Sequence, residues 1–304
     1  MTEGVISELK ELIALKRFAK RTHYKPAGRA AGAGNYLSRL RGRGMDFSEV
    51  RNYQAGDEIR HMEWRVTART GRPHIKVYQE ERERPVVLVV DFNPSMYFGT
   101  RRAFKSVVAT QIAALIAWTA MKQGDRVGAL LYSAYEHHEF TPKARESGVL
   151  PLLASLSHYS RQIHECTNLK PSILMSDELL RLRRVTKPGS ILILISDFYQ
   201  MDQECVKHLT RLCAHNDVLA YHICDALELA PPAPAVYAIS NGQQEILLDT
   251  GSSKVRNDYQ AWCDERWLHL QSQLKRLQIQ YTQVSAEDDL AQVVRRTFPR
   301  RQRG

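Results

Sequence analysis

Two short, wholly aliphatic runs, each leading to an aspartate, constrain the fold of this 304-residue chain more than any other feature. The first is VVLVV at residues 86–90, followed by Asp91, and the second is ILILI at residues 191–195, followed by Ser196 and Asp197. Continuous aliphatic runs of this length are typical of strands buried on both faces of a parallel sheet. We therefore expect a parallel sheet that is covered by helices on both sides.

Predicted strands and helices alternate along the chain from the first run onward. We expect strands at residues 86–91, 126–132, 136–140, 190–196, 218–224 and 279–284, and helices at 101–122, 145–157, 173–184, 202–215, 257–277 and 288–297. This alternation predicts an α/β fold with a doubly wound, mostly parallel sheet of Rossmann type. Two short apolar runs around Asn241-Gly242 predict a β-hairpin insertion.

The first 85 residues have a different character. Residues 3–20 carry apolar side chains at near-helical spacing, which predicts an amphipathic helix. Residues 22–44 are rich in Gly, Ala and Arg without a period, which indicates a loop or an irregular arm. Residues 42–85 mix charged and aromatic side chains irregularly, which predicts short strands and tight turns. We expect an N-terminal segment at 1–85 and an α/β domain at 86–300.

The chain carries an excess of positive charge, with 43 Lys and Arg against 33 Asp and Glu and a formal net charge of +10. This balance favours an acidic partner, which is a protein surface, a nucleic acid or an anionic membrane. Four arginines of the arm could contact phosphates: Arg29, Arg39, Arg41 and Arg43. No recognisable nucleic-acid-binding module accompanies them, so a nucleic-acid partner is not expected.

Cysteine usage and hydropathy indicate the cellular compartment. The five cysteines form no Cys-x-x-Cys pair, so neither a disulfide framework nor a zinc site is indicated and a reducing compartment is expected. The N-terminal stretch carries acidic residues and lacks the apolar core of a signal peptide. The aliphatic runs are too short to span a bilayer. We expect a cytoplasmic protein without a membrane span.

Oxygen-bearing side chains gather at the predicted carboxyl ends of the two aliphatic strands, where open α/β sheets place their binding sites. Asp91, Asn93 and Ser95 alternate after the first strand, and Asp197 follows the neighbouring one, so all four are expected around one crevice. Two adjacent carboxylates repel each other unless a cation lies between them. Oxygen ligands suit Mg²⁺, with Mn²⁺ or Ca²⁺ as alternatives. Without a metal, the aspartates would instead cap helices or accept hydrogen bonds from loop amides.

The arrangement of these residues resembles the von Willebrand factor A-type domain. That fold carries a metal-ion-dependent adhesion site with the pattern Asp-x-Ser-x-Ser, a later Thr and a later Asp. Asp91, Asn93 and Ser95 match the first part, with Asn93 where the pattern has serine; Thr167 is the candidate threonine and Asp197 matches the last aspartate. The resemblance implies that the metal keeps one coordination position open, which a carboxylate from a partner completes.

A second resemblance rests on residues 42–69, which read GRGMDFSEVRNYQAGDEIRHMEWRVTAR. This string is similar to the signature that precedes a von Willebrand A-like domain in the bacterial family called domain of unknown function 58. The matching positions are Phe47, Glu49, Arg51, Tyr53, Gly56, Asp57, Arg60, Trp64, Ala68 and Arg69. The resemblance implies a MoxR-type AAA+ ATPase as partner, and an acidic client protein that supplies the carboxylate.

The charged and aromatic residues of this signature allow two interpretations. Arginine guanidinium groups can pair with carboxylates or stack on aromatic rings, so the segment could be a network that pins irregular backbone. The same side chains could instead contact a partner directly, and the two roles can coexist. The candidate partner surface consists of Arg51, Tyr53, Asp57, Arg60, Trp64 and Arg69.

No catalytic signature is found in the sequence. The chain lacks a Gly-x-Ser-x-Gly elbow, a phosphate-binding loop and a His-Glu-x-x-His motif. We also expect no histidine or lysine at a strand end, where it could act as a base. The favoured hypothesis is a non-catalytic protein-binding adaptor that works with the ATPase in protein assembly or activation. The alternative is a metal-dependent hydrolase that uses Asp91 and Asp197.

Overall fold

The computed structural model describes residues 4–19, 45–80, 84–162, 173–240 and 245–298. These residues form two compact units. The larger unit combines the described parts of 1–31 and 84–301, and the smaller one contains those of 32–83. The two units are described separately below.

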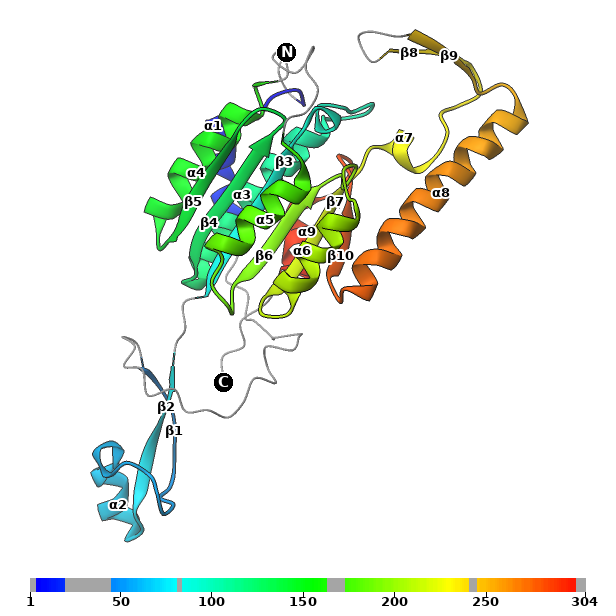
Figure 1. The fold of residues 1–304 in the computed structure, drawn as a ribbon. Coiled ribbons are helices and arrows are strands. Elements are labelled where there is room, and N and C mark those ends of the chain that lie inside the picture. The colour runs from blue at the N-terminus through cyan, green and yellow to red at the C-terminus, as the bar shows by residue number, and fades with distance from the viewer. Residues whose placement is uncertain (1–3, 20–44, 81–83, 163–172, 241–244, 299–304) are drawn as a thin grey trace. The chain divides into compact units, whose positions relative to one another are not determined.

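A six-stranded sheet forms the centre of the larger unit (Figure 1). Its strands, in spatial order, are β10 (Gln280–Val284), β7 (Asp217–Ile223), β6 (Ile191–Ser196), β3 (Pro85–Phe92), β4 (Arg126–Ser133) and β5 (His137–Lys143). Every neighbouring pair is parallel except β4 and β5, which are antiparallel. The prediction of a doubly wound, mostly parallel sheet is confirmed.

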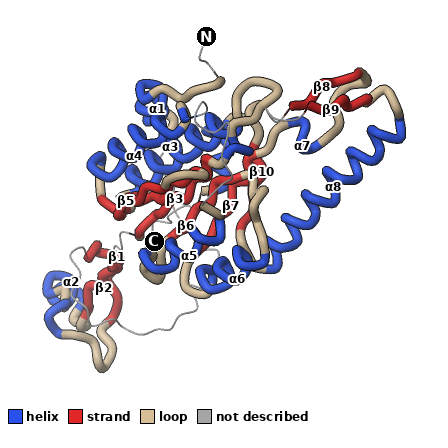
Figure 2. The backbone as a smooth tube through the Cα atoms, turned by 45° about the horizontal axis from the view of Figure 1, so that its top comes forward, coloured by secondary structure: helices blue, strands red, loops and turns tan. Residues whose placement is uncertain are grey.

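Both faces of the sheet are covered, as the aliphatic runs predicted. Along β3, Val86, Leu88 and Val90 belong to one core and Val87 and Val89 to the other, and none of the five is more than 7% exposed. The first core is closed by α1 (Leu9–Ala14), α3 (Lys105–Gln123), α4 (Glu146–Tyr159) and α9 (Leu290–Thr297), and the second by α5 (Met175–Val185), α6 (Gln203–Cys213) and α8 (Ser253–Arg276). Figure 2 shows α1, α3 and α4 on one side of the strands and α5 and α6 on the other.

The strand order changes direction at β3. From β3 the chain continues through β4 to β5 on one side, and later through β6, β7 and β10 on the other. Val90 of β3 pairs with Ile195 of β6, so the carboxyl ends of these strands lie side by side. This is the topological switch point at which open α/β sheets form their binding crevice.

The first helix is shorter than the predicted one, because α1 covers Leu9–Ala14 and is followed by a single 3₁₀ turn at Leu15–Arg17. Its Leu12 side chain is fully buried, and the Leu12 carbonyl accepts a hydrogen bond from Trp118 Nε1 of α3 at 3.0 Å. The helix therefore packs on the α/β unit, whereas the signature segment belongs to the smaller unit.

The predicted hairpin is present as a separate two-stranded sheet of β8 (Val236–Ser240) and β9 (Glu245–Asp249). Its strands are antiparallel, with Ile239 opposite Ile246. The Asn241-Gly242 turn lies outside the described residues. A short helix, α7 (Ala226–Leu229), connects β7 to the hairpin.

The smaller unit pairs β1 (Met45–Asn52) with β2 (His74–Glu80) in antiparallel fashion. Between them lies α2 (Trp64–Thr70), a helix that the sequence reading did not predict. The Glu63 side chain caps its first turn by accepting from Arg65 N, and Gly71 ends it in the left-handed conformation at φ 68°. Two turns defined by their caps are too short to show a hydrophobic period.

Helices that are both long and apolar enough to cross a membrane do not occur in the described ranges of the chain.

Candidate functional site

Asp91 lies near the end of β3 and is only 2% exposed. Its Oδ1 accepts hydrogen bonds from Asn93 N and Asn93 Nδ2, both at 2.8 Å, and its Oδ2 accepts one from Ser196 Oγ at 2.6 Å. Burial and the negative charge of nearby Asp197 raise the pKa of Asp91 to about 6. The ionised form of this carboxyl therefore lacks full compensation from its protein surroundings.

Asp197 follows β6 and is 1% exposed. Its Oδ2 accepts a hydrogen bond from Lys105 Nζ at 2.8 Å and its Oδ1 accepts one from Tyr199 N at 2.9 Å. Burial alone would raise the pKa of Asp197, but the Lys105 ammonium outweighs it and the pKa is lowered. Asp197 is therefore ionised and paired.

Lys105 is a buried cation at the site, and it was not among the site residues predicted from the sequence. It is the first residue of α3, is 2% exposed, and donates to Glu228 Oε1 of α7 at 2.6 Å as well as to Asp197. Burial opposes its positive charge, but Asp197 and Glu228 raise its pKa above the ordinary value. The available signal was a lysine at the start of a helix whose following residues are mostly apolar.

Asn93 brings to the site an oxygen atom that has no hydrogen-bond partner among the described residues. Its Nδ2 donates to Asp91 and, at 3.4 Å, to Gln200 Oε1. Its Oδ1 is buried and accepts no hydrogen bond from the residues that the structure describes. A buried carbonyl oxygen without a donor is costly, so this atom is available to a ligand that accepts electron pairs.

The structure brings together four of the five predicted metal ligands: Asp91, Asn93, Ser95 and Asp197. The Ser95 hydroxyl lies close enough to Asp197 to lower its pKa. Thr167 lies outside the described residues. The protein does not fully compensate the negative charge of Asp91, and Asn93 Oδ1 has no hydrogen-bond donor among the described residues. Both groups therefore suit a hard cation, which prefers charged and neutral oxygen ligands. The hydrogen bonds to loop amides that the metal-free interpretation requires are also present, at Asn93 N and Tyr199 N.

In the described part of the chain, no three His, Cys, Asp or Glu side chains are grouped as metal ligands. A cation at this site would therefore depend on the oxygens of Asn93 and Ser95 as well as on the two aspartates. Oxygen donors of mixed type are common for Mg²⁺, which binds few carboxylates and retains water.

The expectation that no lysine or histidine lies at a strand end was wrong. His222 is the penultimate residue of β7, pairs with Ser196 in the sheet, and lies beside Asp197 together with Lys105. His222 is 8% exposed, and its Nδ1 lies 2.8 Å from the Tyr281 hydroxyl. Burial lowers the pKa of His222 to about 4, so its ring is neutral at pH 7.

The signature residues of the smaller unit fall into two groups. Arg51 holds Asp57 with two hydrogen bonds of 2.8 Å, and Asp57 also accepts from Gln54 N, so these residues fix a turn. The hydrogen bond from Arg51 lowers the pKa of Asp57. The Arg60 side chain is 78% exposed and Trp64 is 65% exposed. Tyr53 is half-buried and Arg69 is exposed.

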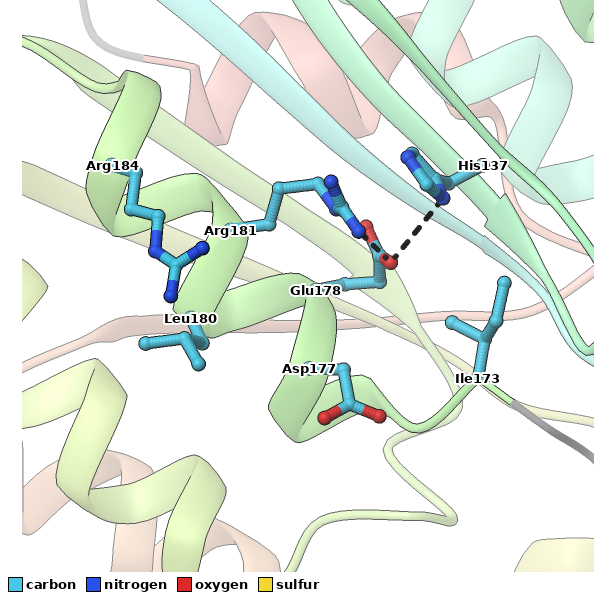
Figure 3. A pocket seen from close by; sticks show the side chains of 7 residues that line it. All are labelled: His137, Ile173, Asp177, Glu178, Leu180, Arg181 and Arg184. Atoms are coloured by element: carbon cyan, nitrogen blue, oxygen red, sulfur yellow. Dashed lines mark ion pairs between the residues drawn. The ribbon is translucent and has the colours of Figure 1, made fainter.

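In the larger unit, a hollow of about 340 Å³ lies between β5 and α5 (Figure 3). Its lining residues are His137, Ile173, Asp177, Glu178, Leu180, Arg181 and Arg184. Glu178 is 1% exposed, and one of its oxygens faces His137 Nδ1 at 3.8 Å and Arg181 Nε at 3.6 Å. Burial raises the pKa of Glu178. None of the predicted site residues lines this hollow.

The chain has recognisable relatives. A family profile described as "Protein of unknown function DUF58" matches residues 49–266. Uncharacterized proteins from Mycobacterium bovis and Mycobacterium tuberculosis are 28% identical over 202 residues, which cover 66% of this chain and 61% of each relative. The chain thus spans about 61% of the length of the curated relatives that it matches.

Solved structures show a weaker likeness. The conserved hypothetical protein BatB from Bacteroides thetaiotaomicron overlays with a TM-score of 0.44 and 12% sequence identity, over 70% of this chain and 96% of that one. An overlay at this score carries no argument about fold or function. The fold assignment therefore rests on the strand order and pairing described above.

Proposed function

The chain belongs to the DUF58 family of proteins of unknown function, and from that premise we propose that it is a non-catalytic protein-binding adaptor. Its binding site is the sheet edge at which Asp91 and Asp197 meet. The observation that carries the proposal is the convergence of two buried carboxylates and one unpartnered amide oxygen, Asn93 Oδ1, at the switch point between β3 and β6. Open α/β sheets form their ligand-binding crevice at this place.

Mg²⁺ is the proposed cofactor, and Asp91, Asn93, Ser95 and Asp197 would hold it; Mn²⁺ and Ca²⁺ carry the same donor preference. When bound, the ion would supply a coordination position to a carboxylate of the partner. Ser196 and the Asn93 amide orient Asp91 through the hydrogen bonds given above.

Lys105 has a separate task in the proposed site. By pairing with Asp197 it keeps that carboxylate ionised and fixed in a buried position. It leaves Asp91 as the group whose charge the protein does not compensate.

We further propose that the adaptor acts in the cytoplasm with a MoxR-type AAA+ ATPase and an acidic client protein. The net charge of +10 supports an acidic client. The exposed side chains of Arg60, Trp64 and Arg69 in the smaller unit supply a surface for the second partner. Arginine and tryptophan are enriched at the energetic centres of protein interfaces.

The metal is tested by titrating the full chain with Mg²⁺ under calorimetry and by thermal unfolding with and without the ion. The variant Asp91→Asn keeps the size of the side chain and removes its charge, and Asp258→Ala, at an exposed position of α8, is the matched control. At a Mg²⁺ concentration 100 times Kd, wild type and control gain about 2.7 kcal/mol of unfolding free energy, and Asp91→Asn gains much less. Equal responses of all three proteins, or none, would overturn the metal site.

The partner is tested by capture of a purified MoxR-type ATPase on immobilised chain. We expect wild type and Asp258→Ala to retain the ATPase and Arg60→Ala with Trp64→Ala to lose it. Retention by the double variant refutes the assignment of this surface. Turnover of a phosphoester panel by the chain with Mg²⁺, lost in Asp91→Asn, would establish the metal-dependent hydrolase in place of the adaptor.

A further inference from the structure

Two exposed aromatic side chains and one half-buried arginine form a stack beside the site. The guanidinium carbon of Arg266, on α8, lies 4.4 Å from the ring centroid of Tyr199 and 5.8 Å from that of Trp262. Tyr199 is 63% exposed and Trp262 is 51% exposed. The two rings hold the guanidinium in place while leaving much of their own surface in water.

Among the residues that the structure describes, none accepts a hydrogen bond from Arg266 or forms an ion pair with it. Asp264 and Glu265 precede it directly on α8, but neighbouring helical positions do not share a face, and Asp264 accepts a hydrogen bond from Gln260. A guanidinium held between rings can present its planar fork to an incoming carboxylate.

Packing of α8 does not cover the two rings of the stack. The helix buries Cys263, Leu270 and Leu274 against the larger unit, and Arg266 borders this face while the Tyr199 and Trp262 rings stay exposed. Trp, Tyr and Arg are the residue types that dominate binding energy at interfaces, and here one of each lies in a single stack.

The stack is continuous with the Asp91–Asp197 site. Tyr199 lies two residues after Asp197, and its backbone N donates to Asp197 Oδ1 at 2.9 Å. The next residue, Gln200, accepts a hydrogen bond from Asn93 Nδ2. A ligand that contacts Asp197 or Asn93 therefore meets the loop that carries the first ring of the stack.

We propose that Tyr199, Arg266 and Trp262 bind an acidic segment of a protein partner, in which a carboxylate pairs with Arg266 and adjacent apolar side chains cover the two rings. This inference rests on the proposed binding function and specifies the partner's chemistry at the same sheet edge. A nucleic acid is the poorer fit, because binding a phosphate backbone takes several cations along its track. Here a single arginine carries the positive charge of the stack, and Asp264 and Glu265 precede it on α8.

The test uses the full chain and a phage library of random 12-residue peptides, selected in the presence of Mg²⁺. We expect the selected peptides to carry Asp or Glu next to aromatic or aliphatic residues. The most enriched peptide is then synthesised with a fluorescent label, and its affinity is measured by fluorescence polarisation for wild type and variants. Selection of peptides without acidic residues, or of none above background, overturns the proposal.

The variants separate the stack from the metal site. Arg266→Ala should weaken peptide binding roughly 10- to 30-fold, Arg266→Lys should fall between it and wild type because the charge remains without the planar fork, and Arg211→Ala, at an exposed position of α6, should change nothing. Melting temperatures verify that each variant is folded.

Asp91→Asn is measured in parallel, and its outcome decides the two proposals independently. Loss of peptide binding in both Arg266→Ala and Asp91→Asn supports the stack and the metal site together. Loss in Arg266→Ala alone supports the stack and refutes the metal-dependent function. Loss in Asp91→Asn alone refutes the stack and leaves the metal site standing, and loss in neither refutes both.

Discussion

Replacement of Lys105 by methionine should destabilise the larger unit by more than most single substitutions. The change removes the ammonium but keeps a long, unbranched side chain. Lys105 is 2% exposed and Asp197 is 1% exposed, so the variant leaves a buried carboxylate without its cation. Removing one partner of a buried ion pair costs about 3–5 kcal/mol. Glu228 contributes less, because its side chain is 23% exposed and can be solvated.

A double-mutant cycle isolates the contribution of this pair. Asp197→Asn alone should cost about 1–3 kcal/mol, because the amide still accepts hydrogen bonds and Lys105 keeps Glu228. In the double variant the stranded charge is absent, so its cost should fall short of the sum of the single costs by about 1–3 kcal/mol. Urea unfolding of the four proteins by circular dichroism at pH 7.5 in EDTA, which excludes bound metal, measures these free energies.

The sign of the pH dependence provides an independent check. The lowered pKa of Asp197 means that its pairing with Lys105 stabilises the protein above the ordinary carboxyl pKa of about 3.9, and this stabilisation is lost as pH falls through the folded-state value. In Lys105→Met, burial of Asp197 is opposed only by the hydrogen bonds from Tyr199 N and Ser95, so its pKa rises and the deficit should shrink between pH 7.5 and 5.5. A Lys105→Met cost under about 1 kcal/mol, or single costs that add within about 0.5 kcal/mol, would refute this account.

Two further predictions concern His222 and the smaller unit. Burial disfavours the charged form of His222 and lowers its pKa to about 4. Wild type should therefore lose about 2.5 kcal/mol of unfolding free energy from this group between pH 7 and 4.5. His222→Phe should lack that loss when urea unfolding is measured at the two pH values, and an equal change of unfolding free energy in both proteins would contradict the assignment. Arg51→Lys breaks the two hydrogen bonds to Asp57 and should speed limited proteolysis within residues 45–80, whereas Arg60→Ala and Trp64→Ala should not speed cleavage at the remaining sites.

The sheet and the positions of the two aspartates were predictable because their signals are local and strong. Uninterrupted aliphatic runs bury both faces of β3 and β6, and in a doubly wound sheet such strands meet at the centre. Asp91 and Asp197 follow these runs directly, so their proximity required only the strand order. Thr167, the metal and the partner surface remain predictions.

Lys105 and His222 were beyond prediction because their roles depend on segments that are distant in sequence. Lys105 acquires its function from Asp197, 92 residues away, and from Glu228, 123 residues away. Glu228 lies on α7, a four-residue helix without a periodic pattern. His222, within an otherwise apolar strand, has the sequence context of a core residue. Helix α2 was not predicted either, because its ends are set by capping residues and its sequence shows no hydrophobic period.

The long separations within the site also bear on when it comes into existence during synthesis. The Ser196 hydroxyl that donates a hydrogen bond to Asp91 lies 105 residues further along the chain, and Glu228, the partner of Lys105, is synthesised later still. A ribosome that adds about 5–20 residues per second needs on the order of ten seconds to make that stretch. During this interval the emerging chain has the first aspartate but none of its later neighbours. A client or ATPase that recognises the assembled edge would therefore engage finished molecules and pass over nascent ones.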